Sequence, residues 1–140
     1  MSVKIKVIGT PSIEIDDRPL RLPLKKAEGI VYYLAVEGRV SRERLASTFW
    51  GAKDENSAYN NFRNALYLLK RCFPTDFIKS DRRNVSIADG CCDLDVVDKV
   101  SRPLVPLPQN LSAELLQGFD VPECADFCNW LLTARSQFRE

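Results

Sequence analysis

The chain of 140 residues contains no histidine, no Cys-x-x-Cys pair, no Gly-rich phosphate-binding loop and no recognisable nucleophile motif. Without histidine it lacks the side chain that enzymes use most often as a general base. The other absences remove the common signatures of nucleotide-binding and metal-binding sites. The sequence therefore predicts a protein that is not an enzyme and that holds no cofactor and no metal ion.

Long apolar segments are also lacking. The longest apolar run, residues 30–36, is far shorter than the roughly 20 residues that a helix needs to cross a bilayer. No signal peptide is recognisable at the N-terminus. We therefore expect a cytoplasmic protein without a membrane partner.

Five cysteines are present, and four of them would suffice for a zinc site. They are Cys72, Cys91, Cys92, Cys124 and Cys128. Cys124 and Cys128 share one face of a predicted helix, whereas the adjacent Cys91 and Cys92 point to opposite sides of a strand. We therefore expect reduced, mostly buried thiols, as is usual in the cytosol. A metal-dependent redox sensor stays open as an alternative that rests on the cysteines alone.

Charge is distributed unevenly along the chain. The total is nearly neutral, with 20 basic and 19 acidic side chains. Residues 56–87 nevertheless have a net charge of +4, with six basic and two acidic side chains, whereas residues 88–140 have −5, with four basic and nine acidic side chains. The nearly neutral total charge conceals this basic block, which is suited to an anionic partner.

The stretch NSAYNNFRNALYLLKRCF, residues 56–73, predicts one helix with two chemically different faces. Apolar side chains recur at helical spacing on the first face: Ala58, Phe62, Ala65, Leu66, Leu69 and Phe73. The opposite face has no acidic residue and carries Asn56, Asn60, Arg63, Asn64, Tyr67 and Arg71. Asn and Arg make bidentate hydrogen bonds to base edges and also reach phosphates, so this face favours double-stranded DNA. An ordinary surface helix with an uncharged polar face is the alternative reading.

The neighbouring segments favour DNA binding. A shorter helix is expected from Ser41 to Trp50, and the loop 51–55 joins it to the 56–73 helix, in which Asn56 is the expected N-cap. Two helices on a short turn form a helix-turn-helix arrangement. A hairpin is expected at 77–87, with its turn at 81–84 and basic side chains at Lys79, Arg82 and Arg83.

The segments before and after the helix-turn-helix are expected to complete the same N-terminal domain. Alternating apolar residues predict strands at 3–7, 13–15 and 20–22, and a helix from Pro23 to Gly38 follows. Its inner stripe is expected to be Leu24, Ala27, Val31, Leu34 and Ala35, with Gly29 reserved for close packing. After a short acidic helix at 93–100, the Pro-rich segment 101–110 predicts a linker.

The C-terminal residues 111–140 are expected to form a separate helical unit, with helices at 111–116 and from Cys124 onwards. The second helix has an apolar stripe that is too large to be left in water. The stripe consists of Phe127, Trp130, Leu131, Ala134 and Phe138. Either the chain continues beyond this helix, or the stripe packs on the N-terminal part or on a partner chain.

Three segments carry a resemblance to a known family. They are the 23–37 helix with Lys26, Ala27, Ile30, Val31, Leu34 and Ala35, the segment VSRERLASTFW, and the segment AYNNFRNALYLLKR. Together they resemble the OmpR-type winged-helix DNA-binding domain of SARP-type bacterial transcriptional activators, over roughly residues 3 to 98. Residues 115–140 resemble the opening of the helical activation domain that follows it. The chain departs from the family at Phe62, where Leu is usual, at Lys70, where Arg is usual, and at Asp17, where Gly is preferred.

The resemblance and the residues together predict an α+β winged helix-turn-helix domain at 1–100, a linker at 101–110 and the start of a helical domain at 111–140. The expected function is sequence-specific transcription regulation, with the 56–73 helix in the major groove and the 77–87 wing on the flank. The resemblance alone implies contact with RNA polymerase through the 51–55 loop, and a homodimer on repeated half-sites is a further arrangement. A winged-helix protein-interaction module without DNA binding is the rival hypothesis.

Overall fold

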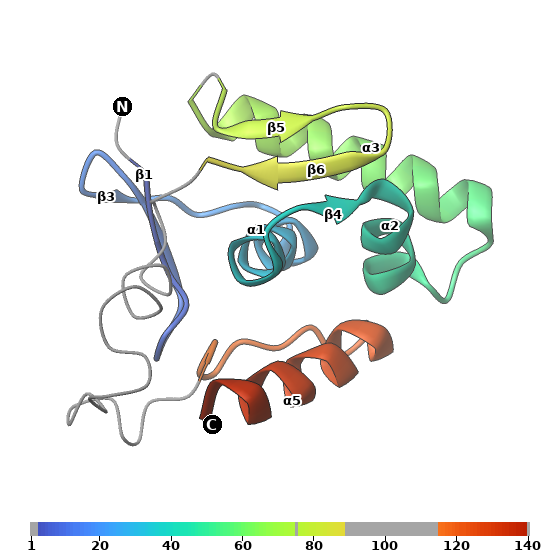
Figure 1. Ribbon diagram of the computed structural model, residues 1–140. Coiled ribbons are helices and arrows are strands. Elements are labelled where there is room, and N and C mark those ends of the chain that lie inside the picture. The colour runs from blue at the N-terminus through green and yellow to red at the C-terminus, as the bar shows by residue number, and fades with distance from the viewer. Residues whose placement is uncertain (1–2, 75, 89–114, 140) are drawn as a thin grey trace.

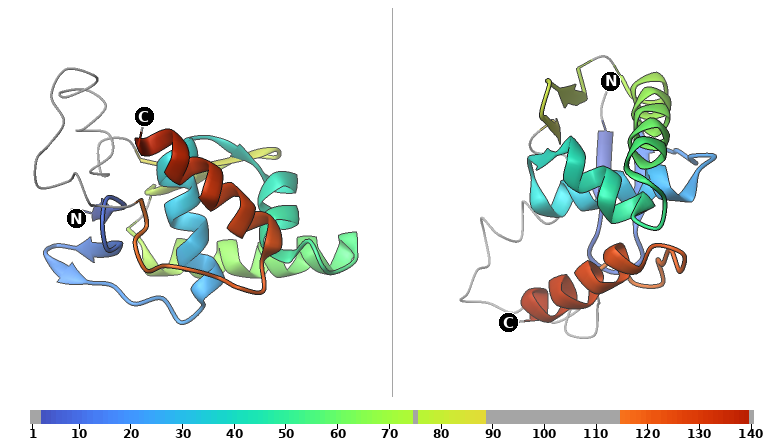
Figure 2. Two further views of the ribbon diagram at one scale, coloured as in Figure 1. Left: turned by 90° about the horizontal axis from the view of Figure 1, so that it is seen from below. Right: turned by 90° about the vertical axis from the view of Figure 1, so that its right-hand side faces the viewer.

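The computed structural model describes residues 3–74, 76–88 and 115–139, which fold as an α+β protein. These residues form two three-stranded antiparallel sheets and four helices. Helix α1 (Lys25–Glu37) runs through the middle of the molecule. Helix α3 (Glu55–Cys72) lies on one side of it, and helix α5 (Ala125–Arg139) lies on the other (Figures 1 and 2).

The first sheet has the strand order β1-β2-β3, with β1 at Val3–Lys6, β2 at Ser12–Ile15 and β3 at Arg18–Pro19. Asp16 and Asp17 form the turn between β2 and β3 with positive φ angles of 52° and 66°, which Asp tolerates better than most residues. The expected third strand at 20–22 is wrong, because this two-residue turn already pairs Arg18 with Ile15.

Helix α1 is buried on almost every side, so the expected single inner stripe is wrong. Tyr32 and Tyr33 are at most 1% exposed, whereas Leu24 lies outside the helix and is 39% exposed. The reason is tertiary, because the C-terminal segment covers the side of α1 that the sequence leaves open. Gly29 serves close packing as expected, since a Cβ there would lie 2.9 Å from Cε1 of Phe49.

The second sheet has the strand order β4-β6-β5. Along the chain, two helices lie between its first strand and its other two strands. Its strands are β4 (Val40–Ser41), β5 (Ile78–Ser80) and β6 (Asn84–Ile87), and α2 (Arg42–Trp50) follows β4 directly. Ser41 caps α2, since its hydroxyl accepts a hydrogen bond from the Arg44 N–H at 3.1 Å. The hairpin expected at 77–87 is thus present as β5 and β6.

The C-terminal segment packs on the N-terminal residues. The expected helix at 111–116 is wrong in its described part, because Leu115 forms an antiparallel bridge with Ile8 and Leu116 has a φ of 51°. Leu116 N–H donates to the Val7 carbonyl at 2.7 Å, which draws both leucines into the core. The helix expected at 93–100 and the linker at 101–110 lie outside the described residues.

The described part of the α5 stripe docks on α1 and α2, which confirms the expected packing on the N-terminal part, whereas the side chain of Phe138 lies outside the description. Phe127, Leu131 and Ala134 are at most 6% exposed, and Trp130 packs against the same core. Trp130 Nε1–H donates to Glu37 Oε2 at 2.9 Å. The boundary between two units at 101–110 remains a prediction.

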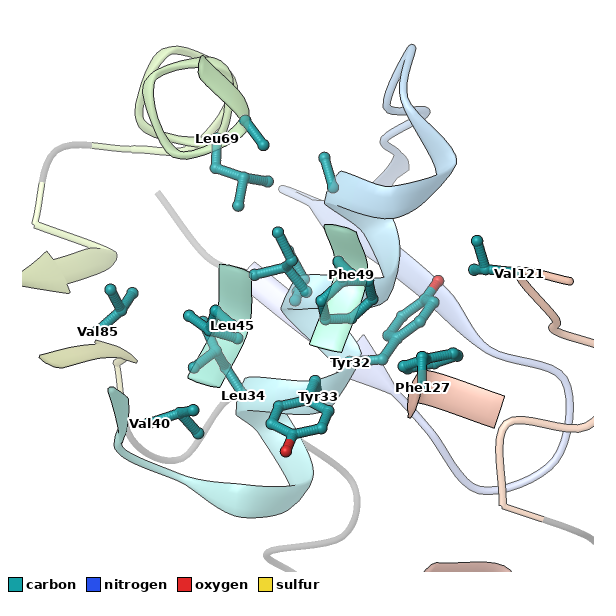
Figure 3. Close-up of a cluster of buried hydrophobic side chains, with 14 of the residues drawn as sticks. Tyr32, Tyr33, Leu34, Val40, Leu45, Phe49, Leu69, Val85, Val121 and Phe127 are labelled. Carbon is teal, nitrogen blue, oxygen red and sulfur yellow. The ribbon is translucent and has the colours of Figure 1, made fainter. Parts of the chain in front are cut away.

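Phe49 of α2 lies at the centre of this shared core, between side chains of α1 and α5 (Figure 3). Its ring centroid is 5.0 Å from that of Phe127 and 6.0 Å from that of Tyr33. Aromatic pairs at such distances contribute about 0.5–1.5 kcal/mol each beyond the area they bury. Trp50 and Phe62 are 6% and 0% exposed, so both rings anchor the core.

Candidate nucleic-acid interface

Both ends of helix α3 are set by residues next to them in the sequence. Asp54, rather than the expected Asn56, is the N-cap, because its Oδ1 accepts a hydrogen bond from the Ser57 N–H at 2.8 Å. That bond also lowers the pKa of the Asp54 carboxyl. Phe73 lies just outside the helix in an extended conformation, as the residue before a proline prefers.

The two faces of α3 are the ones expected from its sequence. Five side chains on the inner face are buried: Ala58, Phe62, Ala65, Leu66 and Leu69. The six polar side chains of the opposite face are all exposed: Asn56, Asn60, Arg63, Asn64, Tyr67 and Arg71. With 3.6 residues per turn these six positions form one continuous surface, which we call the α3 outer face. The single acid of the helix, Glu55, lies at its first residue.

An aromatic ring lies in the middle of the α3 outer face. Tyr67 is 66% exposed, and the guanidinium carbon of Arg71 lies 5.7 Å from its ring centroid. This cation–π contact holds two of the expected site residues together on the surface. None of the described residues forms a hydrogen bond or ion pair with the side chains of Asn60, Arg63 or Asn64, which leaves these groups available to a ligand.

The β5–β6 hairpin lies beside α3, so the structure brings the two halves of the expected site together (Figure 1). Lys70 Nζ of α3 donates to Ser80 Oγ of β5 at 2.6 Å. Arg63 lies two turns before Lys70, on the edge of the α3 outer face that is nearer the hairpin. Lys79 of β5 is exposed and adds a further positive charge to this surface.

The hairpin tip, residues 81–83, is closed by the side chain of Asp81. Its Oδ1 accepts hydrogen bonds from the backbone N–H groups of Arg83 and Asn84, at 2.8 and 2.7 Å. These bonds are the main reason why the pKa of the Asp81 carboxyl lies below its usual value, with a smaller contribution from Arg39. Arg82 and Arg83 are exposed at this tip.

Two arginines that sequence analysis did not select also belong to this region. Arg42 Nε donates to the Asp81 carbonyl at 2.8 Å, and Arg42 Nη1 lies 3.5 Å from the Tyr59 hydroxyl of α3. Arg39 forms an ion pair with Asp81 at 3.2 Å. A signal was available for Arg42, because cations are disfavoured in the first turn of a helix unless another contact holds them.

The described cysteines do not form a metal site. In the described ranges, no three His, Cys, Asp or Glu side chains lie close enough together to hold a metal ion, and Cys91 and Cys92 lie outside those ranges. Cys124 Sγ–H donates to the Phe49 carbonyl at 3.1 Å. Burial raises the pKa of both the Cys124 and the Cys128 thiol, which keeps them protonated and poorly nucleophilic at neutral pH.

Comparisons with known proteins leave the interface to be interpreted from its own geometry. No helix of the described chain is long and apolar enough to pass through a membrane. A scan against protein-family models finds no family that matches the chain, and a search of curated proteins finds no match.

Proposed function

We propose that this protein is a sequence-specific DNA-binding transcription regulator of the winged-helix type. In this proposal α3 enters the major groove and the β5–β6 hairpin is the wing on the flank. The observation that carries the proposal is the α3 outer face. Its exposed Asn and Arg side chains lie beside a basic hairpin, and no acidic side chain interrupts that face.

The arrangement of the elements supports the proposal. Helices α2 and α3 are joined by a short exposed connection, as a helix-turn-helix requires. The hairpin follows α3 and is anchored through β4, whose Val40 pairs with Val85 of β6. The hairpin is therefore attached to the same frame as α3, and both would meet one duplex in a constant relation.

The side chains divide into two proposed roles. Asn60, Arg63 and Asn64, near the middle of α3, are placed to read base edges, for which Asn suits adenine and Arg suits guanine. Lys79, Arg82 and Arg83 on the hairpin are placed to hold phosphates, which gives affinity without sequence information. Tyr67 lies on the same surface, and Asn56 and Arg71 extend it towards the two ends of the helix.

The direct test is a binding titration on random duplex DNA at several salt concentrations, followed by fluorescence anisotropy. Each phosphate contact contributes about one unit to the slope of log affinity against log salt concentration. The double substitution Arg82→Ala with Arg83→Ala should therefore lower affinity and flatten the slope by about two units.

A charge-matched control is Lys4→Ala with Lys6→Ala, on the exposed side of β1 in the first sheet. It removes the same charge from a part of the molecule outside the proposed interface, and it should leave the slope nearly unchanged. Equal effects of the two pairs would show that the surface binds DNA through net charge alone. Absence of any salt-dependent binding would reject DNA as the partner.

The protein-interaction module remains the second candidate, and one observation favours it. Tyr67 exposes 66% of its surface at the centre of the α3 outer face, and exposed aromatic residues are enriched where proteins meet. A partner protein held there would bind with little dependence on salt. Under this alternative, Tyr67→Ala would abolish binding of the partner protein. The unaltered protein would show no affinity for DNA.

Contact with RNA polymerase through the 51–55 loop is a further part of the proposal. All five residues are exposed, with Glu55 already the first residue of α3, and Lys53 N–H donates to the Trp50 carbonyl at 3.1 Å, which shapes the turn. The assignment rests on the family resemblance. A homodimer on repeated half-sites is likewise a proposal, and a palindromic or directly repeated operator would support it.

A further inference from the structure

Asp81 is an acidic residue at the tip of a basic hairpin. The hairpin sequence IKSDRRNVSI, residues 78–87, contains no other acid. A carboxylate at this position weakens the attraction of the tip for phosphates, because like charges repel over several ångströms even in water. Its presence therefore calls for a role that offsets this electrostatic disadvantage.

The contacts of Asp81 show how much of the tip depends on it. Its carboxylate accepts hydrogen bonds from the backbone of Arg83 and Asn84, and its own N–H donates to the Asn84 carbonyl at 3.0 Å. This is the pattern by which an Asp side chain fixes a tight turn. The conformation of both exposed arginines at the tip follows from that turn.

The same residue ties the tip to the rest of the interface. Arg39 pairs with the second carboxylate oxygen, and Arg42 donates to the Asp81 carbonyl. The backbone N–H of Arg42 also donates to the Arg83 carbonyl at 2.7 Å. Because Arg42 reaches Tyr59 of α3 as well, these contacts form a continuous connection from the hairpin tip to α3.

We propose that Asp81 is a positioning residue, which fixes the hairpin tip so that Arg82 and Arg83 are held at one place beside the α3 outer face. The inference rests on the proposed function, since it names how the proposed wing is oriented towards DNA. It makes a prediction that electrostatics does not make, because electrostatics alone treats every neutral replacement of this acid alike.

Two substitutions at this position separate charge from geometry. Asp81→Asn and Asp81→Ala remove the same negative charge, but only the Asn side chain keeps an oxygen that can accept the two backbone hydrogen bonds. We expect Asp81→Asn to bind random duplex DNA as tightly as the unaltered protein or more tightly. We expect Asp81→Ala to bind about two- to tenfold more weakly than Asp81→Asn, in line with the loss of one or two hydrogen bonds.

Binding is to be measured on random duplex DNA, at a temperature where thermal melts show every variant to be fully folded. Arg39→Ala is the matched control, since it breaks the ion pair but leaves the two backbone hydrogen bonds of the turn in place. This control should lower DNA affinity only by the amount expected from the loss of one positive surface charge. Equal affinities of Asp81→Ala and Asp81→Asn would overturn the positioning role.

A second measurement does not involve DNA. Backbone order parameters from NMR relaxation should stay near the rigid value of about 0.85 for residues 82–84 in Asp81→Asn, and should fall below about 0.6 in Asp81→Ala. A rigid tip in Asp81→Ala would overturn the inference, whatever the binding results. If the tip loosens as expected but the unaltered protein binds no DNA, the proposed function fails, and Asp81 keeps only the role of ordering the tip.

Discussion

Phe127 provides the sharpest test of whether α5 shares one cooperative core with the N-terminal residues. The side chain is 0% exposed, and its ring centroid lies 5.0, 6.0 and 5.5 Å from those of Phe49, Phe119 and Trp130. Replacing it with Ala removes a ring from the centre of the contact between α5 and α2. Substitutions of this kind lower the free energy of unfolding by about 3–5 kcal/mol.

That loss is large compared with the total stability of about 5–15 kcal/mol that is typical of a domain. It cannot come from the helix itself, because Ala has a higher helix propensity than Phe. Leu132→Ala is the matched control, since Leu132 lies on the same helix and is 66% exposed. It should change the free energy of unfolding by less than about 0.5 kcal/mol.

The two tryptophans of the chain make the assay specific to each part. In a Trp130→Phe background, fluorescence reports only on Trp50 of α2, which is 6% exposed. Urea unfolding followed by this signal should have a lower midpoint in Phe127→Ala, and the free energy of unfolding should fall by the full amount of about 3–5 kcal/mol, the same loss as circular dichroism gives. An unchanged Trp50 transition would refute the single core, and it would support an independent C-terminal unit.

Three further outcomes are expected. Gly29→Ala should lower the melting temperature despite the better helix propensity of Ala, because the new Cβ would lie 2.9 Å from the ring of the buried Phe49, and overpacking of this kind destabilises by about 1–3 kcal/mol; a rise in melting temperature would contradict the packing. Arg63→Ala should lower the binding free energy by about 1–3 kcal/mol on a selected operator and by much less on scrambled duplex. Arg82→Ala should weaken binding to both duplexes alike, as titrations at several salt concentrations would measure. If neither substitution changes either affinity, the proposed interface is contradicted. Stability to urea should decline as the pH rises past the ordinary cysteine pKa of about 8.5, because the raised pKa of the buried Cys124 thiol keeps its proton in the folded state only, so the unfolded state alone loses a proton there. Cys124→Ala should make that decline shallower, and an equal decline would assign it to other groups.

Local patterns in the sequence were enough to predict the elements that make up the candidate interface. The 3.6-residue spacing of Phe62, Leu66 and Leu69 places the polar side chains of α3 on the outside, and the structure confirms that division within one residue at either end of the helix. Pro74 and Gly38 end their helices for reasons of backbone geometry that act within a few residues. The turn at Asp16 and Asp17 has the same local origin.

Only the tertiary structure decided which surfaces these elements present to one another. Leu115 and Leu116 have a helical pattern but pair with Ile8 and Val7, since burial against a distant strand outweighs local propensity. Tyr32 and Tyr33 are buried because α5 and the segment before it cover the open side of α1.

The contacts of Asp81 have the same origin. Arg39 and Arg42 precede it by 42 and 39 residues. Sequence periodicity describes one element at a time, so a contact between elements this far apart along the chain exists only once the helices have packed and β4 has paired with β6.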